Sequence, residues 1–212
     1  ISGAGSQDIT IQGVNSLKPV DYTPLGDRLE AGTYLFAVIS AGGDVKIHNI
    51  NPNYLQIVLY KIKEMGTQVL TGDNWIEIIS SQRPEPVDII TDPYPGFPTD
   101  LQPIIMAVLT RANGTSVIWE RIFENRFIHI MELQRMGAEI TISGDRATVV
   151  GVERLDGAEV MASDIRAGAA LTVAALGAFG ITTLQRVYHI DRGYQRLEER
   201  LNSLGAKITR KS

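Results

Sequence analysis

The residues in this sequence best suited to chemistry are acids and arginines that stand together where helices are expected to begin. An arginine guanidinium matches phosphate or carboxylate oxygens with two parallel hydrogen bonds. The start of a helix leaves backbone N–H groups unpaired and carries a partial positive charge, so it attracts anions. These features predict a site for an anionic ligand. The groups concerned are Asp27-Arg28, Glu124-Asn125-Arg126, Asp164-Ile165-Arg166 and Asp191-Arg192.

Each of these groups also has an ordinary structural explanation. An aspartate ahead of a helix often caps it, and an aspartate beside an arginine often forms a surface salt bridge of little energetic weight. For any single pair the structural explanation is favoured. The whole set, repeated along one chain, favours a ligand site.

Asp100 differs from the others because no arginine adjoins it in the sequence. It follows Phe97-Pro98-Thr99, at the end of a proline-rich connector that neither a central strand nor a helix interior would tolerate. A carboxylate delivered by so stiff a loop can accept a proton from a hydroxyl group. The alternative is that Asp100 only stabilises the start of a helix, through the interaction of its charge with the helix dipole.

A threefold internal repeat positions these residues. Each copy opens with an aspartate and continues with an apolar helix, a turn, a strand, a second helix and a glycine stop. The copies begin at Asp27, Asp100 and Asp164 and end at Gly66, Gly137 and Gly205. Such a repeat fixes the architecture before any single motif is interpreted.

The periodicity of apolar residues predicts the elements of each copy. Two copies also end in a hairpin, whereas no such hairpin follows in the third. The expected helices are Glu30–Ser40, a helix that Asn53 caps, a helix from Asp100, a helix ending at Arg135, Ala167–Phe179 and Tyr194–Ser203. The expected strands are Val45–Ile50, Val69-Leu70 with Trp75–Ile78, Asp88–Thr91, Ser116–Ile122, Glu139–Ile142 with Ala147–Val150, and Ile181–Val187.

Composition bounds the possible functions. With 212 residues and a net charge of −4, the chain is long enough for one good-sized domain and is no general nucleic-acid binder. The lack of cysteine excludes disulfides, thiolate zinc sites and a cysteine nucleophile within this chain. The apolar run Ala167–Ile181 is shorter than the roughly 20 residues of a membrane span, so it predicts a buried helix. His129 and His189 are expected to be hydrogen-bonded structural residues rather than ligands.

Residues 1–20 lie outside the repeat. Asp8 to Val14 alternates polar and apolar residues, which predicts a half-buried strand. Pro19 and Pro24 bracket an expected linker. A strand without a neighbouring partner suggests that residues before Ile1 belong to the same protein.

Several stretches of the sequence resemble the C-terminal half of UDP-N-acetylglucosamine enolpyruvyl transferases, the 1-carboxyvinyltransferases of peptidoglycan synthesis. They follow the family's order and spacing over almost the whole chain. The matching stretches are Gly3-Ala4-Gly5, Asp27-Arg28 through Gly32-Thr33, Phe97-Pro98-Thr99-Asp100-Leu101-Gln102, Phe123-Glu124-Asn125-Arg126-Phe127, Met136-Gly137-Ala138, Ala162 through Ala167, and Tyr188 through Tyr194.

The resemblance implies an α/β (α+β) fold: a pseudo-threefold repeat of βαβαββ-type units with the helices packed inside, an inside-out α/β barrel domain. It assigns residues 1–20 to the last strand of a preceding domain and a linker. Residues 21–212 become the repeat domain, with units at about 27–80, 100–150 and 164–212.

The resemblance also implies a reaction. The family moves the enolpyruvyl group from phosphoenolpyruvate to the 3-hydroxyl of UDP-N-acetylglucosamine, the first committed step of peptidoglycan synthesis, in the cytoplasm and without cofactor or metal. Asp100 would contact the sugar and take the hydroxyl proton, and the backbone of Ile122 would contact the amino sugar. Arg166 and Arg192 would meet the phosphate and carboxylate of phosphoenolpyruvate. Arg126 and Asp164 would line the same cleft.

This chain departs from the family by matching only its second half. It lacks the family's lysine–asparagine pair and the loop with the proton-donating cysteine, in agreement with the absence of cysteine here. The expected partner is therefore the N-terminal domain of the same enzyme, with no nucleic acid and no membrane. Alone, the chain is expected to show no turnover. The alternatives are a non-catalytic module that binds a phosphate or nucleotide sugar, and a purely structural repeat domain.

Overall fold

The computed structural model describes residues 1–4, 6 and 8–211, and its elements form three units in chain order. The first unit comprises α1 (Arg28–Ala41), β1 (Gly43–His48), the 3-10 turn η1 (Pro52–Leu55), α2 (Gln56–Glu64), β2 (Gln68–Gly72) and β3 (Trp75–Ser80). The second comprises β4 (Ile89–Ile90), η2 (Thr99–Leu101), α3 (Gln102–Leu109), β5 (Thr115–Trp119), α4 (Ile130–Arg135), β6 (Glu139–Ser143) and β7 (Arg146–Val150). The third comprises β8 (Glu159–Met161), α5 (Ile165–Gly177), β9 (Thr183–Gln185), α6 (Tyr188–Asp191) and α7 (Leu197–Ser203).

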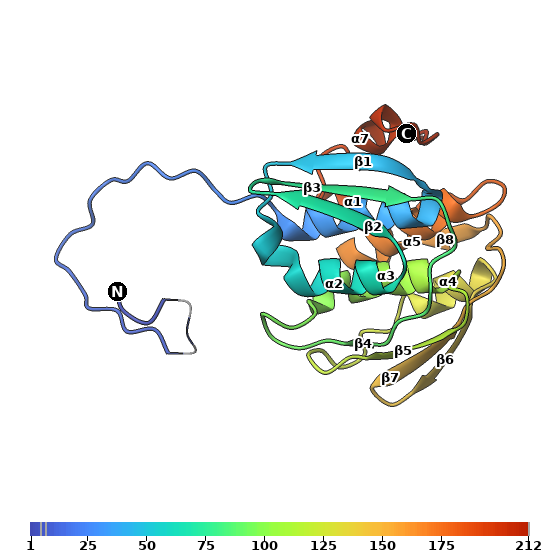
Figure 1. The fold of residues 1–212 in the computed structure, drawn as a ribbon, viewed down its shortest axis with the longest axis horizontal. Helices are drawn as coiled ribbons and strands as arrows, with labels where there is room; N and C mark the ends of the chain where they lie inside the picture. The colour runs from blue at the N-terminus through green and yellow to red at the C-terminus, as the bar shows by residue number, and fades with distance from the viewer. Residues whose placement is uncertain (5, 7, 212) are drawn as a thin grey trace.

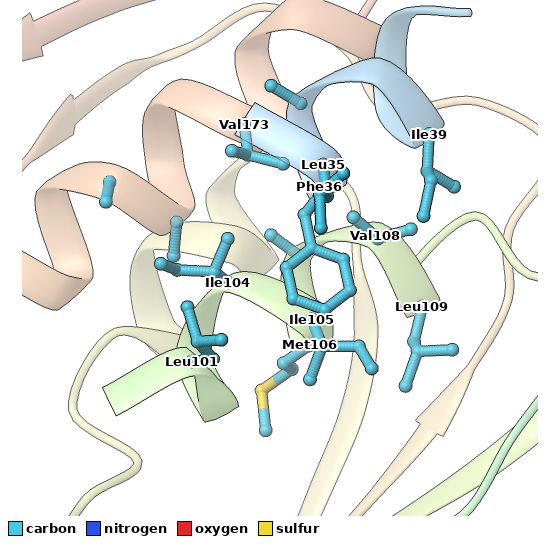
Figure 2. Close-up of a cluster of buried hydrophobic side chains, with 14 of the residues drawn as sticks. Leu35, Phe36, Ile39, Leu101, Ile104, Ile105, Met106, Val108, Leu109 and Val173 are labelled. Carbon is cyan, nitrogen blue, oxygen red and sulfur yellow. The ribbon is translucent and has the colours of Figure 1, made fainter. Parts of the chain in front are cut away.

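The first long helix of each unit lies in the interior of the molecule. Helices α1, α3 and α5 contact one another, and every residue of α3 is buried. Their sequences are apolar on all sides, as a helix surrounded by protein requires. Figure 2 shows Phe36 of α1, Ile104 and Val108 of α3 and Val173 of α5 within one buried cluster. The expected arrangement with the helices inside is confirmed.

The sheets cover these helices from outside. Strands of the first unit form an antiparallel sheet in the order β1-β3-β2, and those of the second a sheet in the order β4-β5-β7-β6, in which β4 and β5 run parallel. Figure 1 shows α1, α3 and α5 between these two sheets. The third sheet consists of β8 and β9, which run parallel. Both predicted hairpins, β2–β3 and β6–β7, are confirmed.

The three inner helices run in the same direction, since contacts join their C-terminal ends to one another. At the C-terminal ends, the Arg111 guanidinium donates hydrogen bonds to the carbonyls of Ser40 at 3.2 Å and Gly177 at 2.8 Å. Arg111 itself follows α3 closely, so one side chain joins the ends of all three helices. Its positive charge also opposes the negative ends of their dipoles.

Small residues allow α5 to pack closely. A Cβ on Gly168 would lie 2.6 Å from Cγ1 of Ile190, which is nearer than packed carbon atoms approach. Helix α6 therefore sits directly against the first turns of α5. Among the described residues, none of the helices is long and apolar enough to cross a bilayer.

The strand expected from Asp8 to Val14 does not form in this chain. These residues are exposed, and the described part of this segment pairs only through an isolated bridge between Ser2 and Thr10. Figure 1 shows the segment as an arm that leads away from the body of the molecule. A strand needs a neighbouring edge to satisfy its backbone groups, and the described residues of this segment pair with none of the sheets.

Two other local predictions require correction. The N-cap of the second helical segment is Asn51, whose side chain accepts from the Asn53 N–H, so the segment begins as η1 ahead of the expected place. The helix expected from Tyr194 to Ser203 begins only at Leu197. Arg196, just before it, has a left-handed φ of 50°, which interrupts the backbone between α6 and α7.

Candidate active site

The N-terminal ends of α1, α3 and α5 meet on one side of the molecule. A Cβ on Gly32 of α1 would lie 2.6 Å from Cδ1 of Leu101, at the start of α3. The Thr33 hydroxyl lies 2.8 Å from the hydroxyl of buried Tyr194, whose pKa is raised chiefly by burial and is also influenced by the charge of Arg166 on α5. Three positively polarised helix ends therefore face a common region.

Asp100 lies at the centre of this region and accepts hydrogen bonds from two arginines. Nη2 of Arg126 and Nε of Arg166 each donate to Oδ1 of Asp100 at 2.7 Å. The side chain of Asp100 retains 28% of its exposed surface. The acid that has no arginine beside it in the sequence thus pairs with two that lie far away along the chain.

The ionisation of Asp100 follows from these contacts. Burial acts to raise the pKa of the carboxyl, but the hydrogen bonds and charges of Arg166 and then Arg126 outweigh it and leave the pKa below its ordinary value. The hydrogen bond to Asp100 in turn is the main cause that raises the pKa of Arg166. The carboxylate is therefore ionised and ready to accept a proton, although a weak base while both arginines remain in place.

Asp164 and Asp27 act as helix N-caps, which was the structural explanation for aspartates at these positions. Oδ1 of Asp164 accepts from the backbone N–H groups of Arg166 and Ala167, and Asp27 caps α1 in the same way through Leu29 and Glu30. Burial opposes ionisation of Asp164, yet its backbone hydrogen bonds lower its pKa overall. Neither aspartate forms a salt bridge with the arginine next to it in the sequence, within the described residues.

Ile122 lies in the loop after β5. Its backbone N–H donates to Oε1 of Glu120 at 2.9 Å, and its side chain is exposed on the surface. The Ile122 N–H is thus already satisfied within its own loop, so its backbone carbonyl is the group left for a ligand. Arg126 lies further along the same loop, and its guanidinium stacks over the ring of Phe123, 4.8 Å from the ring centre.

The prediction that arginines stand at the starts of helices is half right. Arg28 and Arg166 lie in the first turns of α1 and α5, whereas Arg126 precedes α4 by several residues and Arg192 follows α6 as its C-cap. Asp191 is the last residue of α6 and therefore does not cap a helix start; its carboxylate pairs with Arg210. No helix begins at Arg192, because Gly193 packs against Ile165 and the left-handed backbone of Arg196 delays the start of α7.

Arg192 lies close to the site but outside its ion pairs. The contact of Gly193 with Ile165 places the neighbouring Arg192 beside the first turn of α5. The residue is exposed, and among the described side chains its guanidinium has no salt-bridge partner. The structure therefore brings together Asp100, Arg126, Arg166 and the nearby Asp164, and leaves Arg192 at their edge.

Two of the three histidines, His129 and His189, differ in their surroundings. His129 is hydrogen-bonded as expected, with Nε2 3.2 Å from the sulfur of Met106; it is also buried, and burial lowers its pKa to about 4. His189 stacks against Tyr188, and its buried Nδ1 lacks a hydrogen bond, so the expectation of a hydrogen-bonded residue is wrong there. Within the part of the chain described, no three acid or histidine side chains cluster in a way that could hold a metal ion.

Glu120 and Thr99 are functional candidates that the sequence did not single out. The Thr99 hydroxyl donates to Oε2 of Glu120 at 2.9 Å, next to Asp100. Thr99 lies within a stretch that resembles the family, which was a usable signal. Glu120 directly follows an ordinary strand and carries no local signal, because the two hydroxyls that bond to it, those of Thr91 and Thr99, come from segments distant in the sequence.

A separate pocket of about 440 Å³ opens beside the start of α1. Its lining includes Arg28, whose guanidinium lies 5.2 Å from the ring centre of Tyr94, and the side of α2. Asp100, Arg126 and Arg166 do not line it. The pocket therefore differs from the region in which the acid and arginines gather.

The arrangement of inner helices and outer sheets is that of an enolpyruvyl transferase, and the chain belongs to the EPSP synthase (3-phosphoshikimate 1-carboxyvinyltransferase) family, whose profile matches residues 1–201. Within that family it is similar to UDP-N-acetylglucosamine 1-carboxyvinyltransferases. The protein of that name from Anaeromyxobacter sp. (strain Fw109-5) is 50% identical over 210 residues, and that from Geobacter metallireducens 48% identical over 210 residues. The resemblance inferred from the sequence is confirmed.

The matches cover nearly all of this chain and half of each relative: 99% of the chain and 50% of either protein. The chain thus spans about half the length of the curated relatives it matches. Among solved structures, the enolpyruvyl transferase NikO from Streptomyces tendae has a TM-score of 0.81 at 29% identity, over 91% of this chain and 46% of that one. An EPSP synthase from Acinetobacter baumannii, with a TM-score of 0.67 at 19% identity over 86% of this chain and 46% of that one, supports the fold alone.

Proposed function

We propose that this chain forms the C-terminal half of a UDP-N-acetylglucosamine 1-carboxyvinyltransferase. The enzyme would transfer the enolpyruvyl group of phosphoenolpyruvate to the 3-hydroxyl of UDP-N-acetylglucosamine, for peptidoglycan synthesis in the cytoplasm. The names of the relatives support this acceptor, since they share about half of the residues of this chain.

The reaction sets clear requirements for the protein. The sugar oxygen bonds to C2 of phosphoenolpyruvate, the bond from C2 to the phosphate oxygen breaks, and inorganic phosphate leaves. The hydroxyl proton must pass to a base, and the charges of the phosphate and carboxylate must be held throughout. An ionised carboxylate and a group of arginines meet these two needs.

The observation that carries the proposal is the pairing of Asp100 with Arg126 and Arg166. In this role Asp100 contacts the sugar and accepts the proton of its 3-hydroxyl. Arg166 and the exposed Arg192 bind the phosphate and carboxylate of phosphoenolpyruvate, and Arg126 and Asp164 line the same region. The backbone of Ile122 contacts the amino sugar.

The ion pairs of Asp100 suggest how binding and chemistry are coupled. While both guanidiniums donate to one oxygen of the carboxylate, its basicity is low. An incoming anion competes for the same N–H groups, and each arginine that turns toward it leaves Asp100 a stronger base. The arginines would thus serve the resting site and the anionic substrate in turn.

We further propose that this half is inactive alone. The chain spans half the length of its relatives and contains no cysteine, whereas the resemblance implies a cysteine proton donor in the other half. The alternative is a module that binds a phosphate or nucleotide sugar without chemistry.

The test measures phosphate release and enolpyruvyl product with phosphoenolpyruvate and either UDP-N-acetylglucosamine or 3-phosphoshikimate as acceptor. Two proteins are compared: the 212-residue chain, and the protein in which this chain is joined to the other half. Turnover of the joined protein with UDP-N-acetylglucosamine alone supports the proposal. Turnover with 3-phosphoshikimate would assign the other acceptor.

Binding measurements separate the remaining alternative. Micromolar affinity of the isolated chain for UDP-N-acetylglucosamine, with no turnover by the joined protein, would favour a binding module. Product formed by the 212-residue chain alone would contradict the claim that this half is inactive.

A further inference from the structure

Glu120 is a buried acid at the end of β5, with 4% of its surface exposed. Among the described residues no lysine or arginine forms a salt bridge with it; its two oxygens instead accept four hydrogen bonds, from two hydroxyls and two backbone N–H groups. A buried carboxylate with this many neutral donors is held firmly, because each lost bond would leave a polar group unsatisfied.

These four bonds join segments that are separate in the sequence. Oε1 accepts from the Thr91 hydroxyl at 2.8 Å and from the N–H groups of Ile122 at 2.9 Å and Phe123 at 3.1 Å. Oε2 accepts from the Thr99 hydroxyl at 2.9 Å. One carboxylate therefore connects Thr91 in the middle of the proline-rich connector, the turn before α3 and the loop after β5.

The connector is tied to the same loop a second time. Oγ1 of Thr91 accepts from the backbone N–H of Arg121 at 2.9 Å while donating to Glu120. The Thr91 N–H also donates to the Trp119 carbonyl at 2.9 Å. The position of this loop relative to the connector is thus fixed by both backbone and side-chain bonds.

Thr99 is the direct connection to the candidate base. It occupies the first position of η2, a single 3-10 turn whose second residue is Asp100. The η2 turn has no side-chain cap from its own preceding residue, Pro98. The Thr99–Glu120 hydrogen bond ties this turn to the start of the loop carrying Ile122, and the ion pair of Asp100 with Arg126 ties it to a later part of the same loop.

We infer that Glu120 is a positioning residue, which fixes the carboxylate of Asp100 relative to the backbone of Ile122 and so aligns the acceptor hydroxyl with its base. This inference rests on the proposed function, in which both Asp100 and Ile122 contact the sugar. Glu120 touches no substrate itself. A displacement of about 1 Å at a reacting group can reduce a rate on the order of 100-fold, so the alignment matters for turnover.

Three variants of the joined, two-half protein test the inference. Glu120→Ala removes all four bonds, and kcat is expected to fall on the order of 10- to 100-fold. In Glu120→Gln the side-chain oxygen can still accept from the groups that bond to Oε1 of Glu120. The NH2 group can donate to the hydroxyl of Thr99, which accepts as well as donates. This variant should therefore retain most of the wild-type kcat.

Thr99→Val breaks only the link to Asp100 and provides a test if Glu120→Ala does not fold. It should lower kcat on the order of 10-fold with little change in KM for the sugar nucleotide, because binding through the Ile122 loop is preserved. Thr110→Val is the matched control: Thr110 is also a buried threonine, but its hydroxyl bonds to Ala107 at the far end of α3. Its kcat should equal that of the wild type.

A double-variant cycle distinguishes positioning from general stability. If Thr99 acts through Asp100, Thr99→Val has no further effect on kcat in an Asp100→Asn background. Independent, additive losses would overturn the inference, as would full kcat in Thr99→Val or an equal loss in Glu120→Gln and Glu120→Ala. Full activity of Asp100→Asn alone would instead contradict the role of Asp100 in the proposed function.

Discussion

Nε of Arg166 donates a 2.7 Å hydrogen bond to Oδ1 of Asp100, across a separation of 66 residues in the sequence. Arg166 lies in the first turn of α5 and Asp100 in the turn before α3, so the contact joins two of the three inner helices. It also places a cation on the candidate base.

Replacement of Arg166 should raise the pKa of Asp100. Burial already favours the neutral acid, and the Arg166 hydrogen bond and charge are the largest of the opposing influences. In Arg166→Gln the carboxyl should therefore take up its proton at a higher pH than in the wild type. Carbon-13 NMR titration of the Asp100 carboxyl measures this directly. Arg154→Gln, which affects an exposed arginine paired with Asp156, should leave the titration unchanged, and an unmoved Asp100 in Arg166→Gln would contradict the prediction.

Asp100→Asn should abolish most of the turnover of the joined protein. The amide can still accept from an arginine but cannot take the hydroxyl proton, and loss of a general base costs on the order of 10² to 10⁴ in rate. Steady-state kinetics should show this loss in kcat. Circular dichroism should show an unchanged fold, so that an inactive but unfolded variant is recognised.

Arg192→Ala should reduce activity without reducing stability. The side chain is exposed, and among the described residues it makes no salt bridge, so little folding energy depends on it. If it binds phosphoenolpyruvate, KM for that substrate should rise, by on the order of 10-fold or more for a lost charged hydrogen bond. The melting temperature should stay within about 1–2 °C of the wild type. Unchanged kinetics would remove Arg192 from the site.

His129 should make the protein less stable as the pH falls from 6.5 toward 4. Burial lowers the pKa of His129 from 6.5 to about 4, so the folded state keeps a neutral ring while the unfolded state binds a proton. Its contribution to stability is complete above pH 6.5 and is lost progressively down to the folded pKa. Each unit of pKa shift corresponds to about 1.4 kcal/mol, which gives roughly 3 kcal/mol over this window.

Urea unfolding at several pH values measures the effect of His129. In His129→Leu the slope of unfolding free energy against pH between 6.5 and 4 should become smaller. The lowered pKa values of Asp100 and Asp164 act below their ordinary range, so their loss of stability appears at still lower pH. An identical slope in His129→Leu and the wild type would contradict this assignment.

Arg111→Met should destabilise the fold by about 1.5–3 kcal/mol, the usual value for hydrogen bonds to a charged group. The variant keeps most of the side-chain length but leaves the carbonyls of Ser40 and Gly177 without their donor. Chemical denaturation gives the change in unfolding free energy. The exposed Arg154→Met serves as control and should change it by no more than about 0.5 kcal/mol. Equal effects of the two variants would show that Arg111 does not hold the helix ends together.

The repeat, the inner helices and the hairpins could be predicted because they depend on local patterns. Apolar residues on every side of α3 and α5 indicate burial wherever those helices lie. Gly66, with a left-handed φ of 82°, ends α2 as expected because glycine adopts that conformation without strain. The strand expected at Asp8–Val14 does not form in this chain, because a strand depends on a partner as well as on a local pattern: alternating residues form a strand only when a sheet edge is available to pair with them.

Residue types and their neighbours identified Asp100, Arg126, Asp164 and Arg166 as candidates, but not their partners. From the sequence alone, a salt bridge is expected between each aspartate and the nearest arginine. In the folded chain Asp27 and Asp164 instead cap helices, and Arg166 forms its salt bridge with Asp100. Glu120 was not recognised at all, because its role depends on Thr99 and on the loop geometry after β5. The sequence determined the repeat, the buried helices and the supply of acids and arginines, since these follow from composition and period. Only the tertiary structure decided which acid meets which arginine, because hydrogen bonds depend on distances between segments that the linear order leaves free.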